Sequence, residues 1–333
     1  MARQGKLKLA VAWTVLAALL LVGAVAAVLL GSAMGPLESI RTVLGGDATA
    51  LLIVLQIRLP RIALALLVGG ALSVSGGAMQ GMFRNPLADP HILGVAAGAS
   101  FGAMLAMVFS MDSASFGMGA VTLFAFLGGL GSMFAVYALG RAGRAMTSSG
   151  LLLAGIAVGT VLSAATTLLM SLNHDKVERI IYWNMGSLSV AGWASVLWSL
   201  PMVIIGSLGL LVFGRQLNLL ALGEEEAQHL GVNVDALRRA LMVFAAIATA
   251  GAVSAAGIIG FVGLIVPHGL RMLIGPDHRR LLPLSLLGGG VFLLLADTAA
   301  RNVIPGIELP VGVLTSLIGG PFFLWLLIRK GVR

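Results

Sequence analysis

The sequence predicts an all-α, multi-pass membrane protein that forms a single transmembrane domain over residues 1–333, with about ten spans. Of its residues, 59% are hydrophobic and only 10% are charged, and its mean hydropathy is +1.03. Apolar runs of roughly 18 residues or more recur along the chain, as membrane-spanning helices require. Strands of a membrane barrel would alternate apolar and polar residues, which these runs do not.

Composition also excludes several classes of site. The chain has no cysteine, so we expect no disulfide framework and no cysteine metal site. The net charge of +8 comes from basic residues in short loops beside apolar runs. That placement is typical of orientation signals. We therefore expect contact with membrane lipid and no nucleic-acid partner.

The first span is expected over residues 9–31, after Arg3, Lys6 and Lys8. A cleaved signal peptide is the alternative, but its apolar core is shorter, roughly 7–15 residues. Residues 36–50 are more polar and predict a short interfacial helix outside the membrane.

The second and third spans flank a charged edge and a tight turn. Arg58 and Arg61 precede an apolar run over 62–82, whose many glycines favour close helix packing in lipid. Asp89 followed by Pro90 predicts an N-cap and the start of a new helix.

The other spans follow from apolar runs, with tryptophans bordering the sixth and Ser148 or Ser149 as caps of the fifth. The third to tenth spans are expected at 91–109, 116–139, 150–172, up to about 213, 236–256, 258–274, 281–299 and 309–328. With both termini cytoplasmic, 15 of the 21 basic residues fall inside, which supports this count. Similar glycine-rich segments at 70–76 and 251–257, in spans that are expected to cross in opposite directions, predict an inverted repeat.

The longest polar interruption, residues 215–235, contains three successive glutamates, Glu224 to Glu226. They would occupy the first turn of a short helix, where carboxylates are favoured, and Gly231 would end it. So short a helix needs packing partners, which indicates a docking surface. A solvated acidic loop is the alternative.

Charged residues at the external span ends allow two interpretations. Arg58, Arg61 and Arg301 could extend to lipid headgroups or form a basic rim that receives an acidic partner. Asp297, one turn from Arg301, is the carboxylate placed well inside a span, and we expect it to face protein or water.

Candidate chemistry is sparse. His91 and His268 could ligate iron in a cargo, but histidines near helix ends are more often structural. None of the four lysines ends a phosphate-binding loop, so this chain should not hydrolyse nucleotide. No histidine and acid cluster has catalytic spacing, so an enzyme is disfavoured. An ion-coupled carrier or channel stays the alternative, although Asp297 alone supports it weakly.

Several motifs together resemble one family, the membrane-spanning permease subunits of ATP-driven importers for ferric siderophores, haem and cobalamin. They are Arg-Leu-Pro-Arg at 58–61, Gln80, Asn-Pro-Leu-Ala at 85–88, Leu-Gly-Glu-Glu-Glu-Ala at 222–227, Val-Pro-His at 266–268, Asp-His-Arg at 277–279 and Glu-Leu-Pro-Val-Gly at 308–312.

The resemblance implies a type II importer fold in the bacterial inner membrane. It implies a homodimer, two ATPase subunits that carry ATP and magnesium, and a periplasmic or lipid-anchored binding protein, with no catalytic residue or cofactor in this chain. The ATPase-coupling positions would be Leu222, Gly223, Glu224, Glu225, Glu226, Ala227, Leu230 and Gly231. Arg58, Arg61 and Arg301 would dock the binding protein, and Gln80, Asn85, Leu87, Ser148 and Ser149 would lie at the pathway or its gate.

Overall fold

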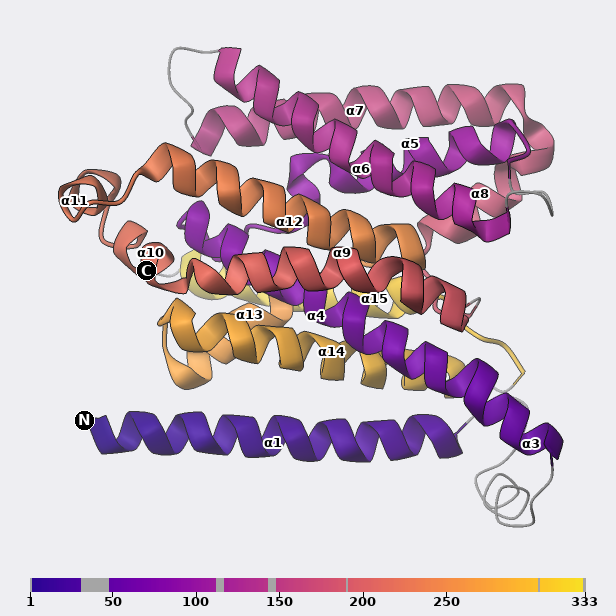
Figure 1. Cartoon of the computed structure of the whole chain (residues 1–333), viewed down its shortest axis with the longest axis horizontal. Helices are drawn as coiled ribbons and strands as arrows, with labels where there is room; N and C mark the ends of the chain where they lie inside the picture. Colours follow the sequence, from indigo (N-terminus) through magenta and orange to yellow (C-terminus); the bar gives the residue numbers. More distant parts are fainter. Residues whose placement is uncertain are drawn as a thin grey trace.

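The computed structural model is a bundle of helices (Figure 1) and describes residues 2–30, 48–111, 117–142, 148–189, 191–304 and 306–331. Each predicted span corresponds to one helix of the described chain. These are α1 (Ala2–Leu29), α4 (Leu59–Met82), α5 (Val95–Val108), α6 (Gly117–Ala142), α7 (Ser148–Leu172), α9 (Trp193–Val212), α12 (Val234–Ala256), α13 (Val262–Ile274), α14 (His278–Asn302) and α15 (Val311–Gly331). Within the described residues, 7 helical stretches are long and apolar enough to cross a bilayer, and α5, α13 and α15 supply shorter apolar ones.

Short helices join the spans and account for most differences from the prediction. They are α3 (Ala48–Ile53), a π-helical turn (Val54–Arg58), two 3-10 turns (Pro90–Leu93 and His174–Lys176), α8 (Val177–Asn184), α10 (Gly214–Leu220) and α11 (Glu224–His229). The second span therefore starts before Arg58, because α3 and the π turn run directly into α4. A π turn fits here, since Pro60 lacks the N–H that a regular helix would use. Most of the expected interfacial segment, 36–50, lies outside the described residues.

The connection before α5 behaves as the local sequence predicts. The Asp89 side chain accepts a hydrogen bond from the backbone N–H of His91 at 2.8 Å, and Pro90 opens the 3-10 turn. Gly94 then takes a left-handed conformation, φ 78°, and α5 begins at the next residue. The predicted N-cap is thus confirmed, although α5 starts a few residues later than expected.

Helix α4 lies at the centre of the bundle and is buried throughout residues 68–82. Its glycines permit this position. A Cβ atom on Gly69 would overlap the backbone of Gly289 in α14, and a Cβ on Gly76 would overlap the backbone of Gly263 in α13. Small residues let helix backbones approach closely in lipid, where dispersion contacts drive association. The predicted role of these glycines is confirmed.

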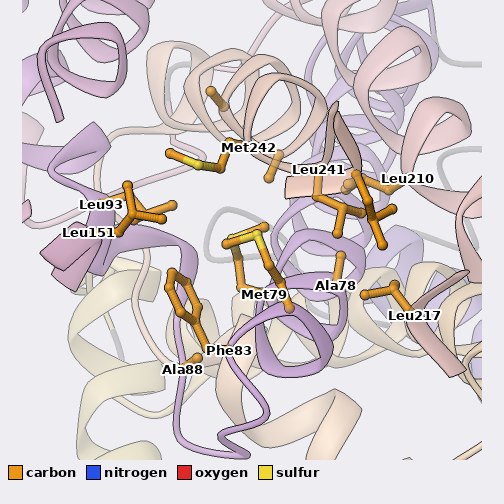
Figure 2. Close-up of a cluster of buried hydrophobic side chains, with 14 of the residues drawn as sticks. Ala78, Met79, Phe83, Ala88, Leu93, Leu151, Leu210, Leu217, Leu241 and Met242 are labelled. Carbon is orange, nitrogen blue, oxygen red and sulfur yellow. The ribbon is translucent and has the colours of Figure 1, made fainter. Parts of the chain in front are cut away.

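An apolar cluster joins α4 to the helices around it at the end of the bundle near α10 and α11. In Figure 2 the side chain of Met79 lies at the centre, with Met242 of α12, Leu210 of α9 and Leu217 of α10 around it. Ala227 of α11 is fully buried in the same cluster. This packing fastens the short helices to the spans.

The path of the chain fits the predicted topology. Helices α1 and α15 both reach the end of the bundle that carries α11 (Figure 1), so the two termini share one side, as an even number of spans requires. Helices α4 and α12 pack together and run in opposite directions. An inverted repeat needs that arrangement, and the repeat itself stays a prediction.

Candidate functional site

The acidic segment forms the predicted short helix, α11, at one end of the bundle. Gly223 precedes it with φ 138°, and Gly231 follows its C-cap with φ 85°. The backbone N–H of Gly231 donates to the carbonyl of Gln228 at 2.9 Å, which ends the helix where the sequence predicts. The segment is therefore a helix and not a loop, while the choice between a docking surface and a merely solvated acidic surface stays open.

Glu224 ties α11 to two spans. Its carboxylate forms a close ion pair with Arg238 of α12, whose side chain is buried. It also lies 3.7 Å from a guanidinium nitrogen of Arg84, just beyond the end of α4. A short helix that is unstable alone is held here by charge and by the burial of Ala227.

A second attachment joins α10 to the start of α14, and the sequence analysis missed it. The side-chain amide of Asn218 donates to Asp277 at 2.6 Å, and its oxygen accepts from the backbone N–H of His278 at 2.8 Å. Asp277 also caps α14 by accepting from Arg279 N–H at 3.1 Å. Side-chain contacts therefore connect α10 and α11 with α12, with the start of α14 and with the turn after α4.

The outward face of this segment combines acidic and apolar groups. Leu222 and Leu230 are 64% and 58% exposed, and Glu225 and Glu226 are exposed between them. Gly223 and Ala227, two other expected coupling residues, are buried and serve the shape of the segment instead. Exposed leucines beside exposed carboxylates, outside the spans, are typical of a protein docking surface.

The opposite end of the bundle holds a buried ionic cluster. The Arg61 guanidinium binds both oxygens of Asp297, at 3.0 Å each, and donates to Glu308 at 2.9 Å. Arg301 lies 3.2 Å from the same Asp297 carboxylate, as its spacing predicts. Asp297 is 1% exposed. The cluster joins α4, α14 and the segment before α15.

These contacts correct the picture of an open basic rim. Arg58, Arg61 and Arg301 are 5%, 6% and 5% exposed, so neither headgroup contact nor an exposed docking surface describes them here. Arg58 donates to the carbonyl of Val28 at the end of α1. Docking of a binding protein by these arginines stays a prediction. The acidic residues of such a protein would have to compete with Asp297 and Glu308 for the guanidinium groups.

A cavity of about 850 Å³ lies between α5 and α7. Most of the residues that line it are small and uncharged, and α7 contributes several hydroxyl groups. The polar or glycine positions of the lining include Ser100, Gly155, Gly159, Thr160, Ser163 and Thr167. The hydroxyls of Thr160 and Thr167 donate to backbone carbonyls four residues earlier, at 2.8 and 3.0 Å. Their donors are used within α7, so these two groups offer lone pairs to the cavity.

The histidines bind within the protein. Among the described residues that line the cavity, His91 is the one ionisable side chain, and its Nε2 lies 3.1 Å from the carbonyl of Ile259. His268 is 8% exposed and packs edge-on against Phe322, with ring centroids 6.1 Å apart. The structural interpretation of both therefore fits better than a ligand role.

The expected gate residues separate into two groups. Gln80 is 3% exposed, accepts from Arg271 at 2.8 Å and donates to the Gly263 carbonyl at 3.2 Å, so it joins α4 to α13 instead of facing a pathway. Asn85 and Leu87 form an exposed turn, and Ser148 and Ser149 begin α7 at the same end of the bundle. Among the described side chains, Gln80, Asn85, Leu87 and Ser149 do not belong to the lining of the α5–α7 cavity. The side chain of Ser148 lies outside the described set, and a gate role for the exposed group stays a prediction.

Comparisons with known proteins agree on one kind of molecule. The model of the FecCD transport family matches residues 19–329. The chain is 47% identical to the cobalamin import system permease protein BtuC of Halobacterium salinarum, over 87% of this chain and 77% of that protein. It is 46% identical to the hemin transport system permease protein HmuU of Yersinia pestis, over 83% of each chain. It is 41% identical to the Fe(3+) dicitrate transport system permease protein FecD of Escherichia coli, over 83% and 85%.

A solved structure gives the same result for the fold. An inward-facing protein described as a metal-chelate type ABC transporter superposes with a TM-score of 0.84 at 35% identity. The match covers 94% of this chain and 97% of that one. The helical bundle of this chain thus has the fold of that transporter.

Proposed function

The chain belongs to the FecCD transport family, and we propose that it is the permease subunit of an ATP-binding-cassette importer that moves an iron chelate or cobalamin across the bacterial inner membrane. Relatives named for cobalamin, hemin and ferric dicitrate support this substrate class. In the proposal, ferric siderophore, haem and cobalamin are the candidate cargoes. ATP and magnesium bind to separate ATPase subunits, so this chain carries out translocation without catalysis.

The proposed assembly contains two copies of this chain, two ATPase subunits and a soluble or lipid-anchored binding protein. The ATPase subunits dock on the cytoplasmic surface formed by α10 and α11. The binding protein docks at the other end and delivers its cargo. ATP binding and hydrolysis then move α11, and the spans attached to it open the pathway to one side at a time, which is alternating access.

The observation that carries the proposal is the attachment of α11 to the spans. Glu224 bridges Arg84 and Arg238, and Asn218 binds the start of α14. An acidic helix with two exposed leucines is therefore mounted on a rigid base instead of a flexible loop. That construction suits a lever that a partner subunit pushes.

We expect Leu222→Asp combined with Glu225→Ala to weaken ATPase binding by about tenfold or more, because an exposed apolar anchor and a charge are both lost. The measurement is the amount of a co-expressed candidate ATPase subunit that co-purifies with the tagged permease in mild detergent. Glu178→Ala, on exposed α8 at the other end, is the matched control. Wild-type recovery of ATPase with the double variant would contradict docking at α11.

An ion-coupled carrier is the other candidate, and the structure weakens its main support. Asp297, the carboxylate on which that reading depends, is bound by Arg61 and Arg301 and is not available to a coupling ion in this conformation. Uptake into vesicles distinguishes the two functions. Import that requires ATP inside and continues without an ion gradient supports the importer, whereas import that follows the gradient alone supports the carrier.

The cavity between α5 and α7 is the proposed route of the cargo, and Gly159 offers a clean way to block it. No atom lies within 4 Å of a Cβ built on Gly159, so Gly159→Phe fills the cavity without displacing the fold. We expect uptake to be largely abolished, while the free energy of unfolding stays within about 0.5 kcal/mol of the wild-type value.

Gly131→Phe is the matched control for this variant. Gly131 also has open space around its Cβ position, but it lines a different cavity, between α6 and α7. Its variant should fold and transport normally. If Gly159→Phe transports as well as Gly131→Phe, the cargo does not pass along this part of α7.

A further inference from the structure

An apolar groove of about 420 Å³ runs between α6 and α12, apart from the proposed cargo route. Its walls come from both helices and contain Leu130, Met133, Phe134, Met242, Val243 and Ile247. Phe134 is 72% exposed and Val243 is 54% exposed, so the groove opens to the surroundings of the bundle. Its apolar lining suits a hydrocarbon chain.

The groove lies on a different side of the molecule from the α5–α7 cavity. Helix α7 separates that cavity from a second one, lined by Gly128, Ser132, Val158 and others between α6 and α7. Helix α6 then separates the second cavity from the groove. Two helices therefore stand between the groove and the cargo route.

One end of the groove is polar and basic. Arg239 and Tyr137 line it there, at the end of the bundle that carries α11. The adjacent arginines of α12 point in different directions, because consecutive helical residues are about 100° apart. Arg238 is buried against Glu224, whereas Arg239 is exposed at the groove.

Among the described residues, Arg239 at this end of the groove has no acidic partner. Within the part of the chain that the structure describes, no carboxylate lies within ion-pair distance of Arg239, and Asp235, one turn earlier on α12, is not paired with it. Arg141, exposed and one turn beyond Tyr137 on α6, adds a second positive charge on the same helix face.

We propose that this groove binds an anionic phospholipid from the surrounding leaflet. One acyl chain lies along the apolar walls, and the phosphate accepts hydrogen bonds from the Arg239 guanidinium and the Tyr137 hydroxyl. Guanidinium and phosphate match in geometry, and basic pockets between spans bind anionic headgroups. The bound headgroup would sit beside Arg238 and hence beside the attachment of α11.

The absence of cysteine from the chain allows a direct test. Val243→Cys is labelled with a small fluorophore, and the full chain is placed in phosphatidylcholine vesicles. A small mole fraction of nitroxide-labelled phosphatidylglycerol, or of nitroxide-labelled phosphatidylcholine, is the quencher. Leu153→Cys is the matched control label, because Leu153 is 70% exposed on α7 and does not line the groove.

We expect labelled phosphatidylglycerol to quench at Val243 with about fivefold higher apparent affinity than labelled phosphatidylcholine. The preference should vanish at Leu153 and in the Arg239→Gln background, whose monodispersity in detergent confirms that it folds. Equal quenching by both lipids at Val243, or a preference that survives Arg239→Gln, would overturn the proposal. Protection of the Val243 label from both lipids would also overturn it, since another protein surface, such as a second copy, would then cover the groove.

Discussion

Asp297→Asn should destabilise the protein by about 3–5 kcal/mol, the largest loss expected from a nearly isosteric change in this chain. The substitution keeps the shape of the side chain but removes the charge between Arg61 and Arg301. Both guanidinium groups are buried, so both would lose the buried carboxylate that they share, and only the partly exposed Glu308 would stay beside Arg61. The measurement is the unfolding midpoint of the purified chain in mild detergent.

Glu308→Gln is the matched control for this cluster. Its carboxylate also binds Arg61, at 2.9 Å, but its side chain is 32% exposed, so water can replace it at a cost of about 1 kcal/mol or less. The double variant Arg61→Met/Asp297→Asn should lose less free energy of unfolding than the two single variants lose in sum, because the two side chains interact directly. If the unfolding midpoint of Asp297→Asn equals that of the wild type, the ionic cluster is hydrated and the prediction is wrong.

Gly76→Leu should leave no folded protein, and even Gly76→Ala should cost about 1–3 kcal/mol. The added Cβ would overlap the backbone of Gly263, and a backbone cannot rotate out of the way as a side chain can. Helices α4 and α13 would have to separate at the centre of the bundle. The recovery of monodisperse protein and its unfolding midpoint measure this effect.

Gly131→Ala provides the comparison, because a Cβ at that position meets nothing within 4 Å. It should match wild type or exceed it slightly, since alanine favours a helix more than glycine does. Equal stability of Gly76→Ala and Gly131→Ala would show that the close approach of α4 and α13 is not needed for the fold.

The spans could be predicted from sequence because each depends on a local property. A run of apolar residues must leave water whatever its neighbours are, so each of the ten runs predicts one apolar helix, long or short. The Asp89 cap and the stop at Gly231 were equally accessible, since each is decided by residues within one turn. The acidic helix α11 belongs to the same group.

The burial of the external arginines could not be predicted in this way. Arg58 and Arg61 look like the charged edge of a span because they flank Pro60 and stand directly before the apolar run over 62–82. The partner that buries Arg61 is Asp297, which lies 236 positions later in the chain. Gln80 was misread for the same reason, as its partner Arg271 lies 191 positions away. Pairings of this kind depend on the packing of the helices and have no local signal.

The hydroxyl groups along α7 have a kinetic consequence. The hydroxyl groups of Thr160 and Thr167 already donate hydrogen bonds to backbone carbonyls of α7. These two groups can therefore accept hydrogen bonds from a cargo but cannot donate any to it. A chelate whose surface is rich in oxygen acceptors would therefore gain little by pausing there. We expect short residence times inside the permease, with turnover limited by the movement of the helices and affinity supplied by the protein that delivers the cargo.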